Sequence, residues 1–218
     1  MIATILIAAL TGTPFPAQAT YRYTGSMAGQ RVGSWSVSVT HDPDQTQIDE
    51  TSSASIFGMP LAATAQLVLG PDFAPTKYNG AYHTPNQSPT VSVVATSSSA
   101  TVIGALSSEP RQFSLVPNTR HFVVIEPGLL AGLFALPAQL EAWKDSSVTW
   151  ITPATAQAES LSANPTPSTV RPAGVAAQDV VLAIDRPVAV TIWYDPSTLV
   201  PDEITVPSQN AILTRERS

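Results

Sequence analysis

The sequence contains no cysteine and few charged side chains. Charged residues make up 12% of the 218 positions, about half the share of ~25% that is usual in soluble globular proteins. Without cysteine the chain has no disulfide bridge, no thiolate nucleophile and no cysteine to carry a lipid. A chain of this length without disulfides must be held together by a hydrophobic core.

Basic residues are also scarce, and the formal net charge is −6. Binding of nucleic acid needs a basic face that neutralises phosphates, so nucleic acid is excluded as a partner. The same charge disfavours adsorption to anionic lipid headgroups. Polarity comes instead from serine and threonine, which make up about a fifth of the chain and suit the surfaces of strands.

Motifs for catalysis or metal binding are missing as well. There is no Gly-x-Ser-x-Gly turn and no glycine-rich phosphate loop. Of the three histidines, His41 lies beside Asp42 and Asp44, but without the spacing that defines a metal site. We therefore predict no metal and no cofactor. A hydrolase with a Ser–His–acid site around His121 or His41 stays open, because such a triad is defined by geometry.

The first 19 residues are typical of a signal peptide. Residues 1–10 are almost all apolar, and the run is too short to span a bilayer. Ala17 and Ala19 flank Gln18 in the small-x-small pattern of a cleavage site, although no Lys or Arg precedes the apolar run. We predict cleavage after Ala19, a single β-rich domain over residues 20–218, no stable membrane anchor, and a periplasmic or secreted location. The alternative is a buried first strand.

Alternating apolar residues predict strands along most of the chain. Trp35, Val37 and Val39 alternate with serines, and residues 61–69 and 188–194 show the same period of two. The shorter candidates are residues 21–25, 46–56, 76–82, 91–96, 101–105, 112–116, 121–125, 147–151, 180–184, 203–206 and 211–215. Strands of this spacing with one apolar face predict an antiparallel sheet, sandwich or open barrel.

One segment has a helical pattern instead. Leu129, Leu133, Leu136 and Leu140 recur every three or four residues, and apolar residues occupy most of the circumference. We predict a helix over about residues 127–144 that Pro137 kinks or splits, and that a sheet face must cover. Residues 156–177, with few large apolar side chains, are predicted to form a loop or an irregular edge hairpin.

Both ends of the chain resemble a group of uncharacterised exported bacterial proteins. The likeness rests on residues 21–23 and 29–35 as an opening hairpin, and on residues 190–195 and 204–209 as a closing hairpin. That group is similar in architecture to the lipoprotein-carrier and lipoprotein-receptor proteins of the periplasm. The resemblance implies an incomplete antiparallel barrel, here of about 9–12 strands, with the apolar helix on its concave face. It supplies no catalytic residues.

These observations lead to two hypotheses of function. The first is a non-enzymatic protein that binds or carries a lipid-like molecule in a cavity between sheet and helix. Its predicted lining residues are Trp35, Leu67, Leu130, Leu133, Phe134 and Trp193. A concave face completely filled by Leu130, Leu133 and Phe134 would contradict it. The second is a structural module of the cell envelope that binds another protein through a sheet edge or surface.

Overall fold

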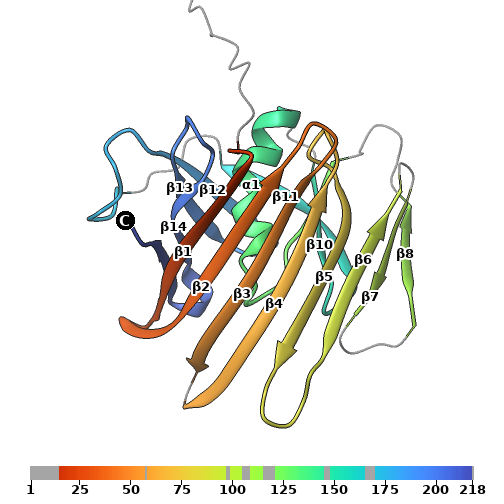
Figure 1. Cartoon of the computed structure of the whole chain (residues 1–218), viewed down its shortest axis with the longest axis horizontal. Coiled ribbons are helices and arrows are strands. Elements are labelled where there is room, and N and C mark those ends of the chain that lie inside the picture. The colour runs from red at the N-terminus through yellow and green to blue at the C-terminus, as the bar shows by residue number, and fades with distance from the viewer. Residues whose placement is uncertain are drawn as a thin grey trace, which may run out of the picture.

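The computed structural model describes residues 15–56, 58–96, 99–104, 109–114, 121–144, 148–164 and 170–217. Within these ranges the chain forms fifteen β-strands, one α-helix and one short 3-10 helix. Most of the predicted signal peptide, residues 1–14, lies outside the described residues. Figure 1 shows the strands as one large curved sheet with the helix behind it.

The elements follow one another along the chain with short connections. The first eight strands are β1 (Gln18–Met27), β2 (Gln30–His41), β3 (Thr46–Ile56), β4 (Met59–Leu69), β5 (Pro75–His83), β6 (Thr90–Ala95), β7 (Ser99–Ile103) and β8 (Arg111–Ser114). The remaining elements are β9 (Phe122–Val124), α1 (Ala131–Trp143), β10 (Val148–Thr152), β11 (Gln157–Asn164), β12 (Val180–Arg186), β13 (Val190–Tyr194), β14 (Pro201–Val206), η1 (Pro207–Gln209) and β15 (Ala211–Arg215).

All fifteen strands belong to a single open sheet. Their spatial order is β8-β7-β6-β5-β4-β3-β2-β1-β15-β14-β13-β12-β11-β10-β9, so the first and last strands are neighbours near its middle. Every pairing is antiparallel except that of β9 with β10, which α1 connects. A parallel pair needs such a crossover connection because a tight turn cannot join its strands.

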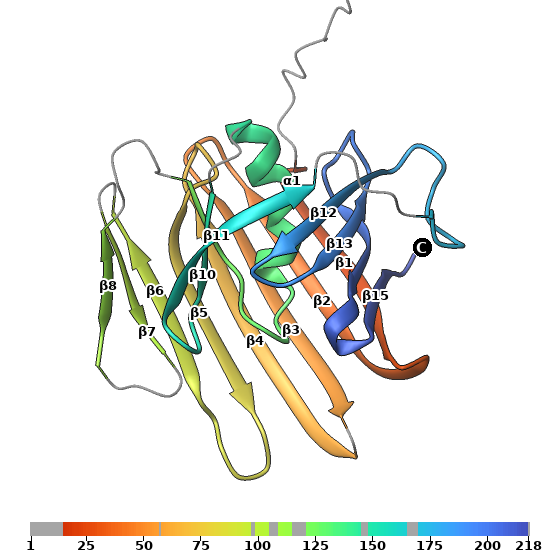
Figure 2. The same cartoon turned by 180° about the vertical axis from the view of Figure 1, so that it is seen from behind.

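The sheet bends around α1. Figures 1 and 2 place the helix between β1–β5 on one side and β10–β12 on the other. Arg111 at the β8 edge donates from Nη1 to the Ala156 carbonyl at 2.9 Å, which ties this edge to the β10–β11 turn. The two edges nevertheless do not pair, and the result is the predicted mainly β half-barrel with one helix on its concave face.

Alternation along the strands separates the two faces of the sheet. In β4, the side chains of Ala63, Ala65, Leu67 and Leu69 are buried while their neighbours are half-buried or exposed. The predicted alternation of strands is thereby confirmed. The inward residues join the core around α1, and the outward residues form the polar outer face of the sheet.

Two glycines allow α1 to come close to the sheet. A Cβ on Gly80 of β5 would lie 2.9 Å from Leu129 Cδ1 at the start of the helix. A Cβ on Gly132 would lie 2.1 Å from the carbonyl oxygen of Val124 in β9. The contact at Gly132 is with backbone and is sterically forbidden, so the helix can lie in its present place only because this position lacks a side chain, whereas at Gly80 the Leu129 side chain would have to shift.

Three details differ from the predictions. Every strand except β11 falls on a predicted stretch, but the total is fifteen instead of about 9–12. Residues 157–164 form β11, an inner strand between β10 and β12, because backbone pairing there does not require large apolar side chains. Pro137 does not split α1, which runs unbroken from Ala131 to Trp143, although no backbone N–H is available at Pro137.

The start of the described chain is part of the core. Phe15 is fully buried, and its ring stacks on that of Phe134 with the centroids 5.8 Å apart. The backbone N–H of His41 donates to the Ala17 carbonyl at 2.9 Å, and β1 begins at Gln18. Cleavage after Ala19 would remove Phe15 and the first two residues of β1, and this cleavage site stays a prediction.

Candidate functional site

Four of the six predicted ligand-lining residues meet in the core. Leu67, Leu130 and Phe134 are at most 2% exposed, and Leu133 is 7% exposed. The Phe134 ring also lies 5.5 Å from the Tyr21 ring. Helix side chains therefore occupy the concave face where an apolar ligand was predicted. None of the four lines the surface hollows described below, and their role in ligand binding stays a prediction.

Of the two tryptophans of the predicted set, Trp35 packs against this core and Trp193 lies elsewhere. Trp35 is half-buried on β2, with its ring across the neighbouring Gly25, where a Cβ would be 2.3 Å from Trp35 Cζ3. Trp193 follows Ile192, which belongs to the core, so alternation directs Trp193 to the other face of β13. There the Arg171 guanidinium lies 4.7 Å from its ring centroid. The structure thus separates Trp193 from the other five.

A buried carboxylate anchors the helix to the sheet. Glu50 of β3 is 1% exposed, and its Oε2 accepts hydrogen bonds from the backbone N–H groups of Leu130 (2.7 Å) and Ala131 (2.8 Å). The N–H groups at the start of a helix have no partner within the helix, and α1 has no side-chain cap of its own, so Glu50 supplies the missing acceptor. Burial raises the pKa of Glu50 to about 7, although the two backbone bonds favour the ionised form.

A second buried carboxylate fixes the segment that leads into α1. Glu126 accepts from the Tyr82 hydroxyl at 2.9 Å and from the backbone N–H of Ala154 at 2.7 Å. Burial raises the pKa of Glu126. Glu50 and Glu126 come from distant parts of the sequence, and neither stands in a recognisable motif. Both carboxylates support the helix from within the fold. Glu50 also lines a hollow of the outer face described below, and its Oε1 is buried without a hydrogen-bond partner among the described residues.

The outer face carries a continuous row of mostly small polar residues. Cross-strand pairing runs from Arg22 of β1 through Ser36, Thr51, Thr64 and Ala81 to Thr90 of β6. Six neighbouring strands contribute one residue each. At ~4.8 Å between strands, the row is about 24 Å long and runs across the strands.

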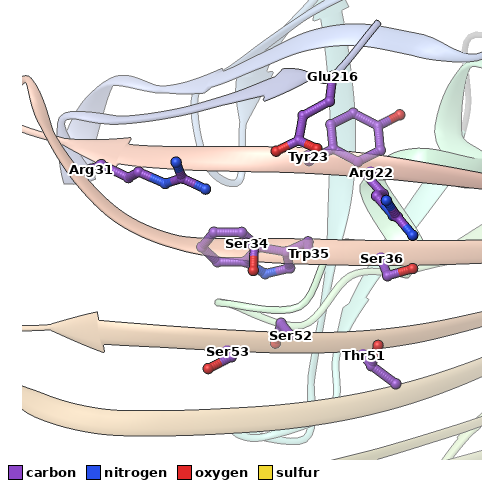
Figure 3. A pocket seen from close by; sticks show the side chains of 10 residues that line it. All are labelled: Arg22, Tyr23, Arg31, Ser34, Trp35, Ser36, Thr51, Ser52, Ser53 and Glu216. Atoms are coloured by element: carbon purple, nitrogen blue, oxygen red, sulfur yellow. The ribbon is translucent and has the colours of Figure 1, made fainter. Parts of the chain in front are cut away.

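The row crosses a hollow in which short side chains are surrounded by long ones. This serine hollow has a volume of ≈ 450 Å³. Its lining is Arg22, Tyr23, Arg31, Ser34, Trp35, Ser36, Thr51, Ser52, Ser53 and Glu216. In Figure 3 the side chains of Ser34 and Ser36 come from β2 and that of Thr51 from the neighbouring β3, with Arg22 and Arg31 near opposite ends. Serine and threonine hydroxyls can both donate and accept hydrogen bonds.

A second hollow continues the row over β3–β6. This amide hollow has a volume of ≈ 570 Å³ and shares Thr51 with the serine hollow. Its lining is Asp49, Glu50, Thr51, Thr64, Ala65, Gln66, Asn79, Gly80, Ala81, Thr90, Val91 and Ser92. Ala81, the partner of Thr64 on the outward face, has a short side chain and makes the floor of this hollow low. The two hollows adjoin at Thr51, and we call them together the polar groove.

The Arg22 end of the groove adjoins a third hollow. This arginine hollow, of ≈ 570 Å³, is lined by Thr20, Tyr21, Arg22, Arg215, Glu216 and Arg217. Arg215 and Arg217 both pair with Asp202, which is 4% exposed. Glu216 accepts a hydrogen bond from Thr24 Oγ1 at 2.7 Å. Sequence reasoning missed this site, because its residues come together only when β15 pairs with β1.

The histidines lie apart from the groove. His41 Nδ1 is 2.7 Å from Thr46 Oγ1, and its ring stacks on Phe73. His83 Nδ1 is 3.3 Å from Ser88 Oγ, and the His121 ring stacks on Trp143. Over the described ranges no three histidine or carboxylate side chains form a group suited to a metal ion, and no helix is long and apolar enough to cross a membrane.

Comparison with known proteins gives structural neighbours only. No family model matches the chain, and no curated protein matches it. A crystal structure of a DUF1089 family protein from Pseudomonas aeruginosa covers 96% of this chain and 97% of its own, at 10% identity and a TM-score of 0.47. A β-barrel-like protein of the DUF1849 domain of unknown function from Brucella abortus covers 91% and 94%, at 9% identity and the same TM-score. The resemblance to lipoprotein carriers stays a prediction.

Proposed function

We propose that this protein is a non-enzymatic binding protein that holds a hydroxyl-rich chain, a glycan, in the polar groove of its outer face. The observation that carries the proposal is the union of the serine hollow and the amide hollow at Thr51. The groove is open, extended across six strands, and lined mainly by hydroxyl and carboxamide side chains. Such groups both donate and accept, as the hydroxyls of a sugar chain do.

Three carboxylates line the groove: Asp49 and Glu216 already accept hydrogen bonds from side chains, and Glu50 is buried against the start of α1. Asp49 accepts from Gln47 Nε2 at 2.7 Å and from Gln66 Nε2 at 3.0 Å. Glu216 accepts from Thr24. Groups engaged in this way hold neighbouring side chains in place and are poorly suited to act as general acid or base. This supports binding without chemistry on the ligand.

We also propose export to the periplasm or the outside of the cell, where polymeric glycans of the envelope are accessible. The apolar start of the chain and the Ala-Gln-Ala pattern at residues 17–19 support export, and the absence of cysteine is compatible with it.

Replacement of Thr51 by tryptophan is expected to weaken glycan binding at least tenfold. Thr51 is exposed and shared by both hollows, so an indole there would fill the groove without disturbing the core. The measurement is calorimetric titration with dextran, chitin oligosaccharides and polygalacturonate. Thr40→Trp is the matched control, because Thr40 is exposed on β2 and lies outside both linings.

Two results would contradict the proposed function. One is wild-type protein that binds none of these glycans. The other is equal affinity of wild type, Thr51→Trp and Thr40→Trp for a glycan that does bind, with unchanged circular dichroism in each variant. Binding lost in Thr51→Trp alone supports the groove as the site.

Carriage of an apolar molecule is a second candidate, favoured by the helix itself. Nine consecutive residues of α1, from Ala131 to Gln139, are buried in a sheet that stays open. An apolar chain could enter the half-barrel if it took the place of these helix side chains, which include Leu133 and Phe134. Native mass spectrometry and lipid extraction of the purified protein test this candidate, and protein free of any lipid-like molecule in both would contradict it.

A further inference from the structure

Basic residues gather at one end of the polar groove. Arg22, Arg31, Arg215 and Arg217 line the serine and arginine hollows, and they are four of the ten Lys and Arg residues in a chain of net charge −6. The other end, the amide hollow, is lined by no Lys or Arg. The amide hollow is lined instead by Asp49 and the buried Glu50, so basic side chains are confined to the Arg22 end of the groove.

Two of these arginines have no partner among the described residues. Arg22 and Arg31 are exposed, and neither forms an ion pair or side-chain hydrogen bond over those ranges. Glu216 follows the last residue of β15, and its backbone N–H donates to the Arg22 carbonyl, but its carboxylate accepts from Thr24. Both guanidinium groups are thus available to a ligand.

The other two arginines are fixed in position by a buried carboxylate. Arg217 Nη2 is 2.5 Å from Asp202 Oδ2, and Arg215 Nη2 pairs with Asp202 Oδ1. The Arg215 guanidinium also lies 5.9 Å from the centroid of the Tyr21 ring. Against the three arginines of the arginine hollow stand the carboxylates of Asp202 and Glu216, so the positive excess there is a single charge.

We propose that this cationic end, with Arg22 and Arg31 as ligand-binding residues, holds carboxylate or phosphate groups of an acidic glycan whose neutral part lies in the amide hollow. The inference rests on the proposed function and names the ligand class of the same groove. Guanidinium groups bind carboxylate and phosphate through paired hydrogen bonds, which ammonium groups do not match.

The spacing of the two arginines favours an extended ligand. Ser36 is the partner of Arg22, and Arg31 lies five residues from Ser36 on β2. At ~3.3 Å per residue their backbones are about 16 Å apart along the strand direction. One small anion does not span this distance, whereas a chain with repeated acidic groups contacts both ends of the serine hollow.

A glycan fits this groove better than an acidic peptide. The groove crosses strands that are paired on both sides, so a peptide cannot add to the sheet as another strand. The inward apolar residues of β3 and β4 face the core, so the groove offers hydroxyl and amide groups in place of apolar side-chain pockets. Sugar hydroxyls match these groups along the whole row.

The test compares an acidic glycan with neutral ones on charge-neutralised variants. Wild type is expected to bind polygalacturonate more tightly than dextran or chitin oligosaccharides. A salt concentration of 0.5 M, about ten times that of a low-salt buffer, is expected to weaken the binding of polygalacturonate only. Arg22→Gln with Arg31→Gln is expected to lose at least tenfold in affinity for polygalacturonate, together with the salt dependence of that binding, while affinity for the neutral glycans changes by a smaller factor. The control is Lys77→Gln with Arg186→Gln, which removes the same charge outside the groove.

The possible outcomes separate this inference from the proposed function. Neutral binding that persists, with polygalacturonate affinity equal in wild type and in the Arg22/Arg31 variant, overturns the anion site alone. Binding of no glycan at all overturns the proposed function and the anion site with it. If polyglutamate binds as tightly as polygalacturonate, and if Thr51→Trp does not weaken its binding, the cationic end binds an acidic peptide. This result would overturn the proposal of an acidic glycan. Polyphosphate and polygalacturonate in parallel distinguish phosphate from carboxylate as the anion.

Discussion

The free energy of unfolding is expected to fall by about 2.5 kcal/mol between pH 5 and pH 8 through Glu50 alone, and Glu50→Gln is expected to abolish this contribution. Burial raises the pKa of Glu50 from 4.5 to about 7. The folded protein therefore holds this proton more tightly than the unfolded chain does. At ~1.36 kcal/mol per pKa unit, the full difference is about 3 kcal/mol.

The sign follows from the order of the two pKa values. Below pH ~4.5 both states carry the proton, and the stability that the neutral carboxyl confers is fully present. As the pH rises toward 7 the unfolded chain releases its proton first, so folding loses this stability, and above pH ~8 the loss is complete. Burial also raises the pKa of Glu126 and of Glu203, which act in the same direction.

The measurement is urea unfolding of wild type and Glu50→Gln at pH 5 and pH 8. Glutamine keeps the shape of the side chain and a carbonyl oxygen for the N–H groups of Leu130 and Ala131. We expect the variant to match wild type at pH 5 and to exceed it by about 2 kcal/mol at pH 8. Glu141→Gln, an exposed change on the same helix, is the control. If Glu50→Gln lowered the free energy of unfolding equally at pH 5 and pH 8, Glu50 would be ionised at both pH values, and its charge would stabilise the start of α1. That result would contradict the prediction.

Substitution of Gly132 by alanine is expected to lower the free energy of unfolding by about 3 kcal/mol. The added Cβ would lie 2.1 Å from the Val124 carbonyl oxygen and 3.1 Å from Ile125 Cα. Both neighbours are backbone atoms, so β9 and α1 would have to move apart. The higher helix propensity of alanine offsets only about 1 kcal/mol of this cost.

Urea or thermal unfolding at pH 5 measures this effect. The matched control is Gly70→Ala, where an added Cβ would meet Asp72 Oδ1 at 3.2 Å and no backbone atom closer than 3.8 Å. The control is expected to change stability by less than about 1 kcal/mol. A more stable Gly132→Ala variant would show that helix propensity outweighs the contact and that α1 is not held tightly against β9.

Local patterns in the sequence identified most of the elements. Residues 61–69 alternate between apolar and polar, and β4 buries the apolar set as expected. The leucines of residues 129–143 recur at helical spacing, and α1 is the one helix of the described ranges besides the 3-10 turn η1. β11 escaped detection because Leu161 is its only large apolar residue, and pairing with β10 and β12 supplies the rest of its stability.

The spatial order of the strands could not be predicted from the sequence. Arg22, Thr51 and Thr90 are scattered over almost seventy positions and stand in no motif, yet antiparallel pairing of β1–β6 places them in one row. Nothing in the local sequence distinguishes Glu50 from the other polar residues of the predicted strand over residues 46–56. Only the approach of α1 to β3 makes it a buried cap with a raised pKa.

The sequence by itself therefore determined the absence of disulfide and thiol chemistry, the β class, the one apolar helix and the polar character of one sheet face. These depend on composition and on periodicity within a few residues. The tertiary structure decided what fills the concave face, where the hollows of the outer face lie and which arginines stand together. These depend on contacts between residues that are distant in the chain, because pairing of β15 with β1 and the bend of the sheet around α1 create them.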